Sequence, residues 1–238
     1  MSGHSKWSTI KRQKGANDVK RGLAFTKLAN LITIAARSGA DPEFNFKLRL
    51  AVDKARAANM PGENIKRAIL RAGSGQEGAG FEEVTYEGYG PGKVGLIVRA
   101  ATDNKNRTSS FIKSTFDKSG GVLAAPGAVA WQFKPVGEVI VDLDGKSIDD
   151  LFLAAADAGA EDAIPGDEDG TAVVQTAPDQ VDEVRSKLSG WGVKEIRLSY
   201  KPISTVNISN ESEAAKVLDL VEKLEESEDV QEVVSNLA

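Results

Sequence analysis

The fold of this chain is decided by residues 136–201, which read VGEVIVDLDGKSIDDLFLAAADAGAEDAIPGDEDGTAVVQTAPDQVDEVRSKLSGWGVKEIRLSYK. Short apolar runs predict strands at residues 138–143, around 163, at 171–176 and at 195–200. Two amphipathic stretches between them predict helices. One opens at Ser147, with Asp150 three residues on as in a capping box, and the other follows Pro178. The order β-α-β-β-α-β is the ferredoxin-like pattern of a split β-α-β unit.

The flanks of this block read as a second α/β domain. Before the block, strands are predicted at residues 81–87, 94–101, 121–123 and 128–133, with a helix at 104–118. After the block, strands are predicted at 205–209 and 230–234, with a helix that Asn210 caps and Glu213 supports. We therefore predict one discontinuous α/β domain, residues 79–135 plus 202–238, interrupted by the insertion of another, residues 136–201.

The first part of the chain, residues 1–78, is predicted to form a basic arm and a helical domain. The arm, residues 1–17, is polar and aperiodic. Apolar residues at helical spacing then predict three helices: through residues 25–36, from Asp41-Pro42 to before Met60-Pro61 with Phe44 in its apolar stripe, and through residues 65–72. Glycines at 73, 75, 78 and 80 predict a flexible hinge. The predicted class is an α+β multidomain protein, with an N-terminal helical domain and two α/β (ferredoxin-like) domains.

Charge is distributed unevenly along the chain. Residues 1–75 carry 15 Lys and Arg against 5 Asp and Glu, whereas residues 76–238 carry 15 against 30. The formal net charge of −5 therefore hides one strongly basic part. Such an asymmetry indicates a polyanionic partner for the basic part, most often nucleic acid. The alternative is a basic helix face that is simply solvated.

Several classes of protein are excluded or disfavoured by composition. The chain has no cysteine, which excludes disulfides, thiol nucleophiles and cysteine-based zinc sites. Its single histidine, His4, leaves no hydrolytic triad, so we expect no enzyme, no metal and no cofactor. The longest apolar stretch, residues 28–36, is far too short to span a membrane, and no apolar signal region follows the basic N-terminus. We expect a cytoplasmic protein without a membrane partner.

Two further motifs are interpreted as structural. The run Gly88–Lys93 lacks the P-loop pattern, because Glu87 and Val94 stand where that pattern needs Gly and Ser or Thr. It is interpreted as a turn between two strands. The acidic cluster at residues 161–169 lacks the ligand spacing of an EF-hand and is interpreted as a solvated hairpin tip.

The candidate nucleic-acid-binding residues lie mainly in the basic arm and the helical domain. Lys and Arg attract phosphates without regard to sequence, Trp7 offers a stacking face for a base, and His4 can donate a hydrogen bond. The segment 102–108 lies at a strand-to-helix junction, where free backbone N–H groups favour anions, although a plain polar cap is an equal alternative. The predicted residues are His4, Lys6, Trp7, Lys11, Arg12, Lys14, Lys20, Arg21, Lys27, Arg67, Arg71, Lys105 and Arg107.

Linked motifs along the whole chain resemble one family. They are Gly3-His-Ser-Lys-Trp7, Lys20-Arg-Gly22, Phe25-Thr-Lys27, Asn59-Met-Pro61, Asn64-Ile65, Arg67-Ala-Ile69, Tyr86-Glu-Gly-Tyr-Gly-Pro-Gly92, Thr102-Asp-Asn104, Asn106-Arg-Thr108, Gly120-Gly121, Trp131-Gln-Phe133, Asp229-Val-Gln231 and Ser235-Asn236. Together they resemble the YebC/PmpR family. The resemblance implies three domains, one helical and two α/β, with one of the α/β domains inserted in the other. It also implies regulation of gene expression, since members are described as DNA-binding transcriptional regulators. A mitochondrial relative is a translational activator for a cytochrome oxidase subunit, and bacterial members have been linked to ribosomes.

Three hypotheses about function follow. The first is a DNA-binding transcriptional regulator, in which the basic arm and helical domain neutralise phosphates and the acidic α/β domains contact a protein partner. The second is a translation factor that binds ribosomal RNA or tRNA on the ribosome, activating translation or relieving stalling. The third is a protein-binding scaffold whose basic face docks an acidic partner.

Overall fold

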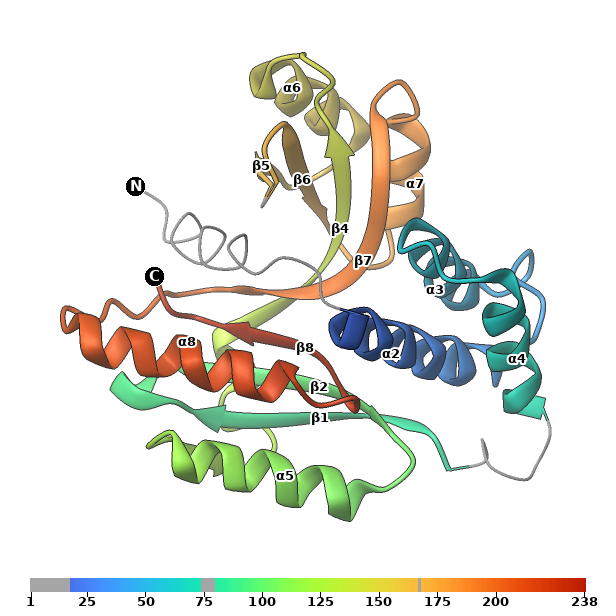
Figure 1. Ribbon diagram of the computed structural model, residues 1–238. Helices are drawn as coiled ribbons and strands as arrows, with labels where there is room; N and C mark the ends of the chain where they lie inside the picture. The colour runs from blue at the N-terminus through green and yellow to red at the C-terminus, as the bar shows by residue number, and fades with distance from the viewer. Residues whose placement is uncertain (1–17, 74–79, 167) are drawn as a thin grey trace. The chain divides into compact units, whose positions relative to one another are not determined.

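The computed structural model describes residues 18–73, 80–166 and 168–238, and the predicted arm, residues 1–17, and most of the predicted hinge lie outside this range (Figure 1). The described residues contain seven α-helices and two four-stranded sheets, which confirms the α+β class. Residues 134–201 form one compact unit, and residues 18–133 and 202–238 belong to a second. The further division of the second unit into a helical and an α/β domain stays a prediction.

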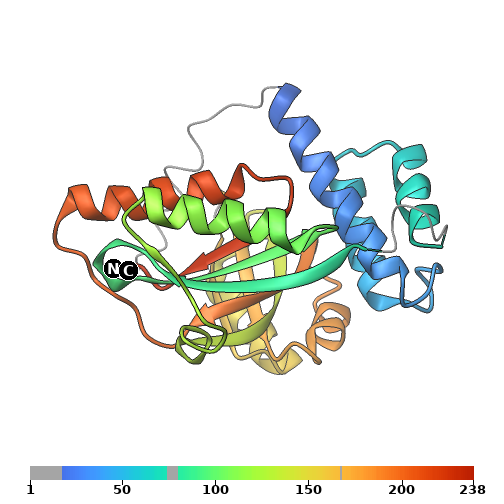
Figure 2. The same cartoon turned by 90° about the horizontal axis from the view of Figure 1, so that it is seen from below.

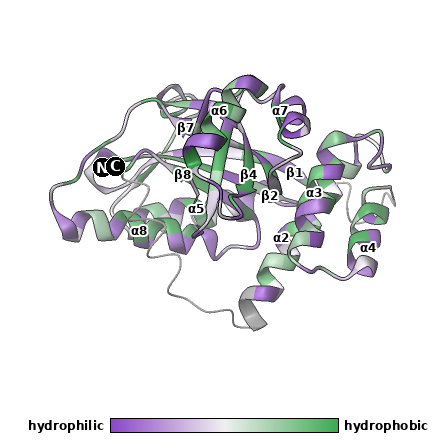
Figure 3. Ribbon diagram, turned by 90° about the horizontal axis from the view of Figure 1, so that it is seen from above, coloured by the Kyte–Doolittle hydropathy of each residue, from purple (hydrophilic) through white to green (hydrophobic). Residues whose placement is uncertain are grey.

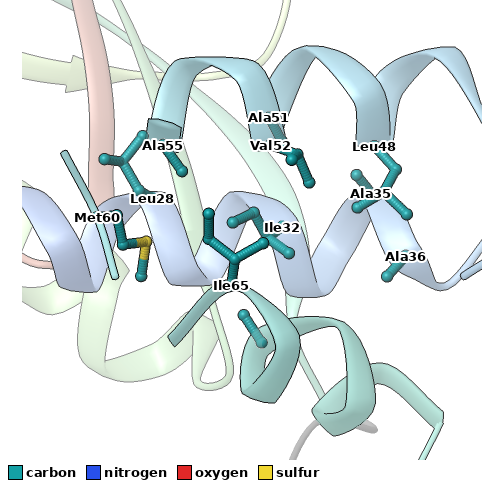
Figure 4. Packing of buried hydrophobic residues seen from close by; sticks show 11 residues of the cluster. Leu28, Ile32, Ala35, Ala36, Leu48, Ala51, Val52, Ala55, Met60 and Ile65 are labelled. Atoms are coloured by element: carbon teal, nitrogen blue, oxygen red, sulfur yellow. The ribbon is translucent and has the colours of Figure 1, made fainter. Parts of the chain in front are cut away.

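Three helices form the first part of the second unit: α2 (Asp18–Ala36), α3 (Phe46–Ala57) and α4 (Gly62–Gly73). Their apolar stripes meet in one core, and Figure 4 shows side chains of all three helices pointing into the space between them. Asn45 joins two of these helices. Its side-chain oxygen accepts from the Leu48 N–H at 3.1 Å and caps α3, while its Nδ2 donates to the Ala35 and Gly39 carbonyls at 2.7 Å each.

The predicted start of the second helix at Asp41-Pro42 is wrong by several residues. Asp41 Oδ1 accepts from the Glu43 N–H at 2.9 Å, and its carbonyl accepts from the Asn45 N–H at 3.0 Å, so Asp41 closes a separate turn. Asn45, not Asp41, is the cap of α3. Phe44 is 89% exposed and does not belong to the core.

The sheet of the second unit has the strand order β3-β1-β2-β8. Its strands are β1 (Glu82–Tyr89), β2 (Gly95–Thr102), β3 (Val122–Ala124) and β8 (Val230–Ser235). Helices α5 (Lys105–Lys118) and α8 (Glu211–Glu225) lie side by side on one face of this sheet (Figure 2). Figure 3 shows hydrophobic and hydrophilic residues alternating along α8, as in an amphipathic helix. Since β2 and β3 flank β1 and are joined through α5, they form a split β-α-β unit.

The predicted turn between two strands is present in the run at residues 88–93, although Gly88 and Tyr89 still belong to β1. It contains the short 3₁₀ helix η1 (Pro91–Lys93) and joins β1 to β2. Gly92 has φ of 68°, in the left-handed region, and a Cβ atom there would lie 2.6 Å from Ile208 Cδ1. Both the backbone conformation and the close packing therefore favour glycine at this position.

Two predicted strands of this sheet are wrong. Residues 128–132 form a loop with the 3₁₀ helix η2 (Ala130–Gln132), because the carboxylate of Glu87 accepts their backbone N–H groups instead of a neighbouring strand. Residues 205–209 make only a single parallel bridge, from Val206 to Leu237. Two residues further on, Ile208 packs against the turn at Gly92.

The inserted unit has the predicted ferredoxin-like topology. Its elements are β4 (Phe133–Asp142), α6 (Ile148–Ala158), β5 (Asp162–Pro165), β6 (Thr171–Thr176), α7 (Val181–Lys187) and β7 (Gly192–Pro202). The strand order β5-β6-β4-β7 is that of a split β-α-β fold, with β4 and β7 adjacent (Figure 1). Ser147 Oγ accepts from the Asp150 N–H at 3.0 Å, which confirms the predicted cap of α6. Helix α7 begins at Val181, three residues after Pro178.

Glu87 is a buried carboxylate whose charge we expect to stabilise the fold. It is 7% exposed and accepts from the N–H groups of Gly127, Val129 and Ala130 at 2.6, 2.7 and 2.8 Å. Burial raises the pKa of Glu87, but these three donors outweigh it and hold the pKa below the ordinary value of 4.5. Its stabilising contribution is therefore complete above that ordinary value and is lost as pH falls through the lower pKa of the folded state.

Replacing Glu87 by Gln should lower the free energy of unfolding by about 1–3 kcal/mol at neutral pH, because one charged acceptor of three N–H groups is lost. Urea denaturation of the wild type and the variant between pH 3 and 7 measures this, and the difference should shrink at the acidic end. Glu83→Gln is the matched control. Glu83 lies on the same strand as Glu87, but it is half-exposed and forms an ion pair with Arg99. Equal losses in the two variants, or a pH-independent difference, would contradict the assignment.

Candidate nucleic-acid interface

The residues predicted in the basic arm are outside the described part of the chain. They are His4, Lys6, Trp7, Lys11, Arg12 and Lys14. Lys20 lies in α2, but its side chain is also outside the described residues. For these residues nucleic-acid binding stays a prediction.

The two described basic residues predicted on α2 have different surroundings. Arg21 is exposed, and its guanidinium lies over the ring of Phe25 at 5.4 Å from the centroid. Lys27 is half-buried, and its ammonium donates to the carbonyl of Glu225 at 2.5 Å. Because Glu225 is the last residue of α8, the Lys27 cation lies at the negative end of that helix dipole. Lys27 thus contributes to packing, whereas Arg21 faces solvent.

The two predicted basic residues of α4, Arg67 and Arg71, differ in exposure. Arg67 is exposed and donates to two neutral acceptors, the Glu63 carbonyl and the Asn64 side chain. Arg71 is half-buried and lies 5.5 Å from the centroid of the Phe81 ring. Leu70, between them in sequence, is 70% exposed. Arg67 therefore presents a full positive charge to solvent.

The junction at residues 102–108 is a capped helix start whose anion is a carboxylate of the protein. Asn104 caps α5 by accepting from the Arg107 N–H at 3.0 Å. The hydroxyl of Thr108 lies 2.7 Å from Asp229 Oδ2 and 2.8 Å from Thr102 Oγ1. Asp229 is 8% exposed and directly precedes β8 in the sequence. This buried carboxylate lies at the N-terminus of α5, where the helix dipole favours negative charge.

The two predicted basic residues of this junction form ion pairs. Arg107 NH2 lies 3.0 Å from both carboxylate oxygens of Asp229 and 2.8 Å from Asp103 Oδ1. Hydrogen bonds to Asp229 first, and to Asp103 second, raise the pKa of Arg107 above its ordinary value. Lys105 Nζ lies 2.8 Å from Glu82 Oε2. A phosphate group bound at Arg107 or Lys105 would therefore share the cation with a carboxylate, which weakens the attraction.

Arg71 and Arg107 line one cleft between the helices and the end of the sheet. Their neighbours in its wall are Thr26, Asn30, Phe81, Asp103, Ser227, Glu228 and Asp229. Sequence reasoning missed the role of Asp229, although it lies in the quoted motif Asp229-Val-Gln231. No spacing along the chain links residue 229 to residue 107, and only the fold brings them together.

Two further features were predicted to be absent, a metal site and a membrane-spanning helix. Outside residues 1–17, 74–79 and 167, no group of three or more His, Cys, Asp or Glu is placed to hold a metal ion. No helix in the same part of the chain is long and apolar enough to cross a membrane.

The fold and site together define a class: a multidomain α+β protein with a basic helical N-terminal part and two α/β sheets, one of which lies in an insertion. The chain belongs to the TACO1/YebC family. The profile described as the TACO1/YebC protein N-terminal domain matches residues 5–75, and the profile described as the TACO1/YebC second and third domain matches residues 81–237. The resemblance that the motifs indicated is thereby confirmed.

Relatives match over nearly the full length. A "Probable transcriptional regulatory protein" of Chloroflexus aggregans is 50% identical, covering 100% of this chain and 95% of the relative. A protein of the same name from Moorella thermoacetica is 46% identical, covering 99% and 95%. The crystal structure of a conserved hypothetical protein from Aquifex aeolicus has a TM-score of 0.90 at 43% identity, covering 98% of this chain and 97% of that one. The names of the first two relatives describe regulators and not enzymes.

Replacing Asp229 by Asn should lower the free energy of unfolding by about 1–3 kcal/mol, because Arg107 and Thr108 both lose a buried charged acceptor. Chemical denaturation at pH 7 measures the loss. Asp103→Asn is the matched control, since its side chain is 43% exposed and binds the same guanidinium; it should cost less than about 1 kcal/mol. If Asp229→Asn lowers the free energy of unfolding no more than Asp103→Asn does, the contacts of Asp229 with Arg107 and Thr108 do not stabilise the fold as expected.

Proposed function

We propose that this protein is a nucleic-acid-binding regulator of gene expression, acting as a DNA-binding transcriptional regulator through its basic N-terminal arm and helical part. The observation that carries the proposal is the charge of residues 1–75, with 15 Lys and Arg against 5 Asp and Glu. The printed names of the relatives support regulation in general. Neutralising phosphates releases condensed counterions, which provides affinity without any sequence readout.

The described part of the helical region supports this proposal with cations that remain exposed. Arg21, Lys47 and Arg67 are exposed, and none of them pairs with a described carboxylate. Their charge is therefore available to a polyanion. By contrast, Lys105 and Arg107 are already paired with carboxylates, so they contribute less than the helical residues.

A second candidate function is that of a ribosome-associated or RNA-associated translation factor that activates translation or relieves stalling. One observation favours it: the outward face of α4 offers a poor recognition helix for a DNA groove. Among the described residues of this face, Lys66 is paired with Glu63 at 3.1 Å, which leaves Arg67 as an exposed cation without a carboxylate partner, and one such cation is few for base readout. A basic arm with a stacking residue such as Trp7 suits structured RNA at least as well as duplex DNA.

A competition experiment distinguishes the two candidates. The full-length protein is bound to ribosomes and to genomic DNA fragments at matched salt. Preference for DNA at about 150 mM salt would support the transcriptional role, since non-specific duplex binding weakens steeply as salt rises. Preference for ribosomes at the same salt would replace it with the translational role. Binding to neither would reject both.

Replacing Lys11, Arg12 and Lys14 together by Ala should weaken nucleic-acid binding about tenfold or more. The slope of log affinity against log salt should fall in magnitude by roughly two to three, because up to three phosphate contacts are lost. Fluorescence anisotropy across a salt series measures both quantities.

The matched control replaces Lys113, Lys118 and Lys216, which are exposed lysines of the acidic part of the chain, by Ala. The same loss of formal charge there should leave the slope nearly unchanged. If both triple variants lower the slope equally, binding depends on overall charge and not on the arm.

A further inference from the structure

Helix α6 of the inserted unit has two apolar faces. The inner face buries Leu151, Ala155 and Ala158 in the core of the unit. The outer face carries Phe152 and Leu153, which are 50% and 66% exposed. Two large apolar side chains that are adjacent and exposed on one helix form a patch rather than scattered surface residues.

Acidic residues border this outer face at helical spacing. Asp149 lies three and four residues before Phe152 and Leu153, and Asp157 lies four residues after Leu153, so all four share one side of the helix. Ala156, which is also exposed, lies between them. In the part of the chain that the structure describes, no Lys or Arg forms an ion pair with Asp149 or Asp157.

The basic residues of the inserted unit are engaged elsewhere. Residues 134–201 contain 15 Asp and Glu against 7 Lys and Arg. Six of these bases form ion pairs away from α6: Lys134 with Glu161, Arg185 with Asp182, Lys187 with Glu183, Lys194 with Asp142, Arg197 with Glu138 and Lys201 with Asp162. The seventh, Lys146, lies 4.5 Å from the centroid of the Trp191 ring and donates to the Gly190 carbonyl. Among residues 134–201, no Lys or Arg is therefore left to neutralise the acidic border of α6.

We infer that the outer face of α6 is a docking site for a basic amphipathic segment of another protein. Apolar side chains of that segment would cover Phe152, Leu153 and Ala156, and its Lys or Arg residues would pair with Asp149 and Asp157. This site is distinct from the proposed nucleic-acid interface, since its carboxylates repel phosphates. Two copies of the same face would bring carboxylates against carboxylates, which disfavours self-association through α6.

The test is a titration of the ¹⁵N-labelled full-length chain with a synthetic 18-residue helical peptide that carries Leu on one face and Lys on both flanks. A second peptide with Glu in place of Lys is the charge control. Amide shifts should concentrate on residues 149–158 with the Lys peptide only. Phe152→Ser with Leu153→Ser should weaken binding about tenfold or more. Asp149→Asn with Asp157→Asn should weaken it severalfold and reduce its salt dependence.

Two matched variants control for general effects. Val122→Ser alters an apolar residue of the second unit that is 55% exposed. Asp179→Asn alters an exposed carboxylate of the inserted unit that lies outside α6. Both should leave peptide binding unchanged. Shifts centred outside α6, equal binding of the Glu peptide, or no effect of the α6 variants would overturn the inference. Amide shifts of α6 that depend on protein concentration alone would overturn the inference in favour of a second copy of the chain. Amide shifts of α6 on addition of a structured RNA would overturn it in favour of RNA.

Discussion

After the long insertion at residues 134–201, the chain must return to β2 and complete its first sheet, and two buried polar residues secure this return. At one end of β8, Asp229 accepts from Arg107 and Thr108, and its carbonyl accepts from the Ala101 N–H at 2.7 Å. At the other end, Asn236 is fully buried and accepts from the Gly95 N–H at 2.8 Å. The discontinuous sheet therefore depends on hydrogen bonds between residues more than 100 positions apart, which clamp β8 at both ends.

This closure has a consequence for function. Arg107 pairs with Asp229 and Asp103, and Lys27 donates to the last carbonyl of α8, so some of the cations that the sequence predicts to bind nucleic acid also stabilise the fold. Exposed cations that pair with no described carboxylate include Arg21 and Arg67 of the helical part. The charges are thus separated along the chain: residues 1–75 are rich in Lys and Arg, while the inserted unit, residues 134–201, is rich in Asp and Glu.

Much of the fold is predictable from the sequence because its signals are local. The caps at Ser147 and Asn210, the stripe of α8 and the β-α-β-β-α-β order of the insertion all follow from spacing along the chain. The failures have one cause, which is competition from distant or alternative partners. Glu87 takes the N–H groups of residues 127–130 from a predicted strand, and Asn45 replaces Asp41 as a cap. No spacing along the chain predicts that Arg107 pairs with Asp229. The sequence therefore leaves two alternatives for residues 102–108, an anion-binding site and a polar helix cap.

The central claim is that the positive N-terminal part binds a phosphate polymer. The most direct measurement is the affinity of the purified full-length chain for a DNA duplex, a structured RNA and ribosomes, taken from low ionic strength upward. The account predicts binding to at least one of them at low salt, with an affinity that falls steeply as salt rises. No binding to any of the three at low ionic strength would contradict it.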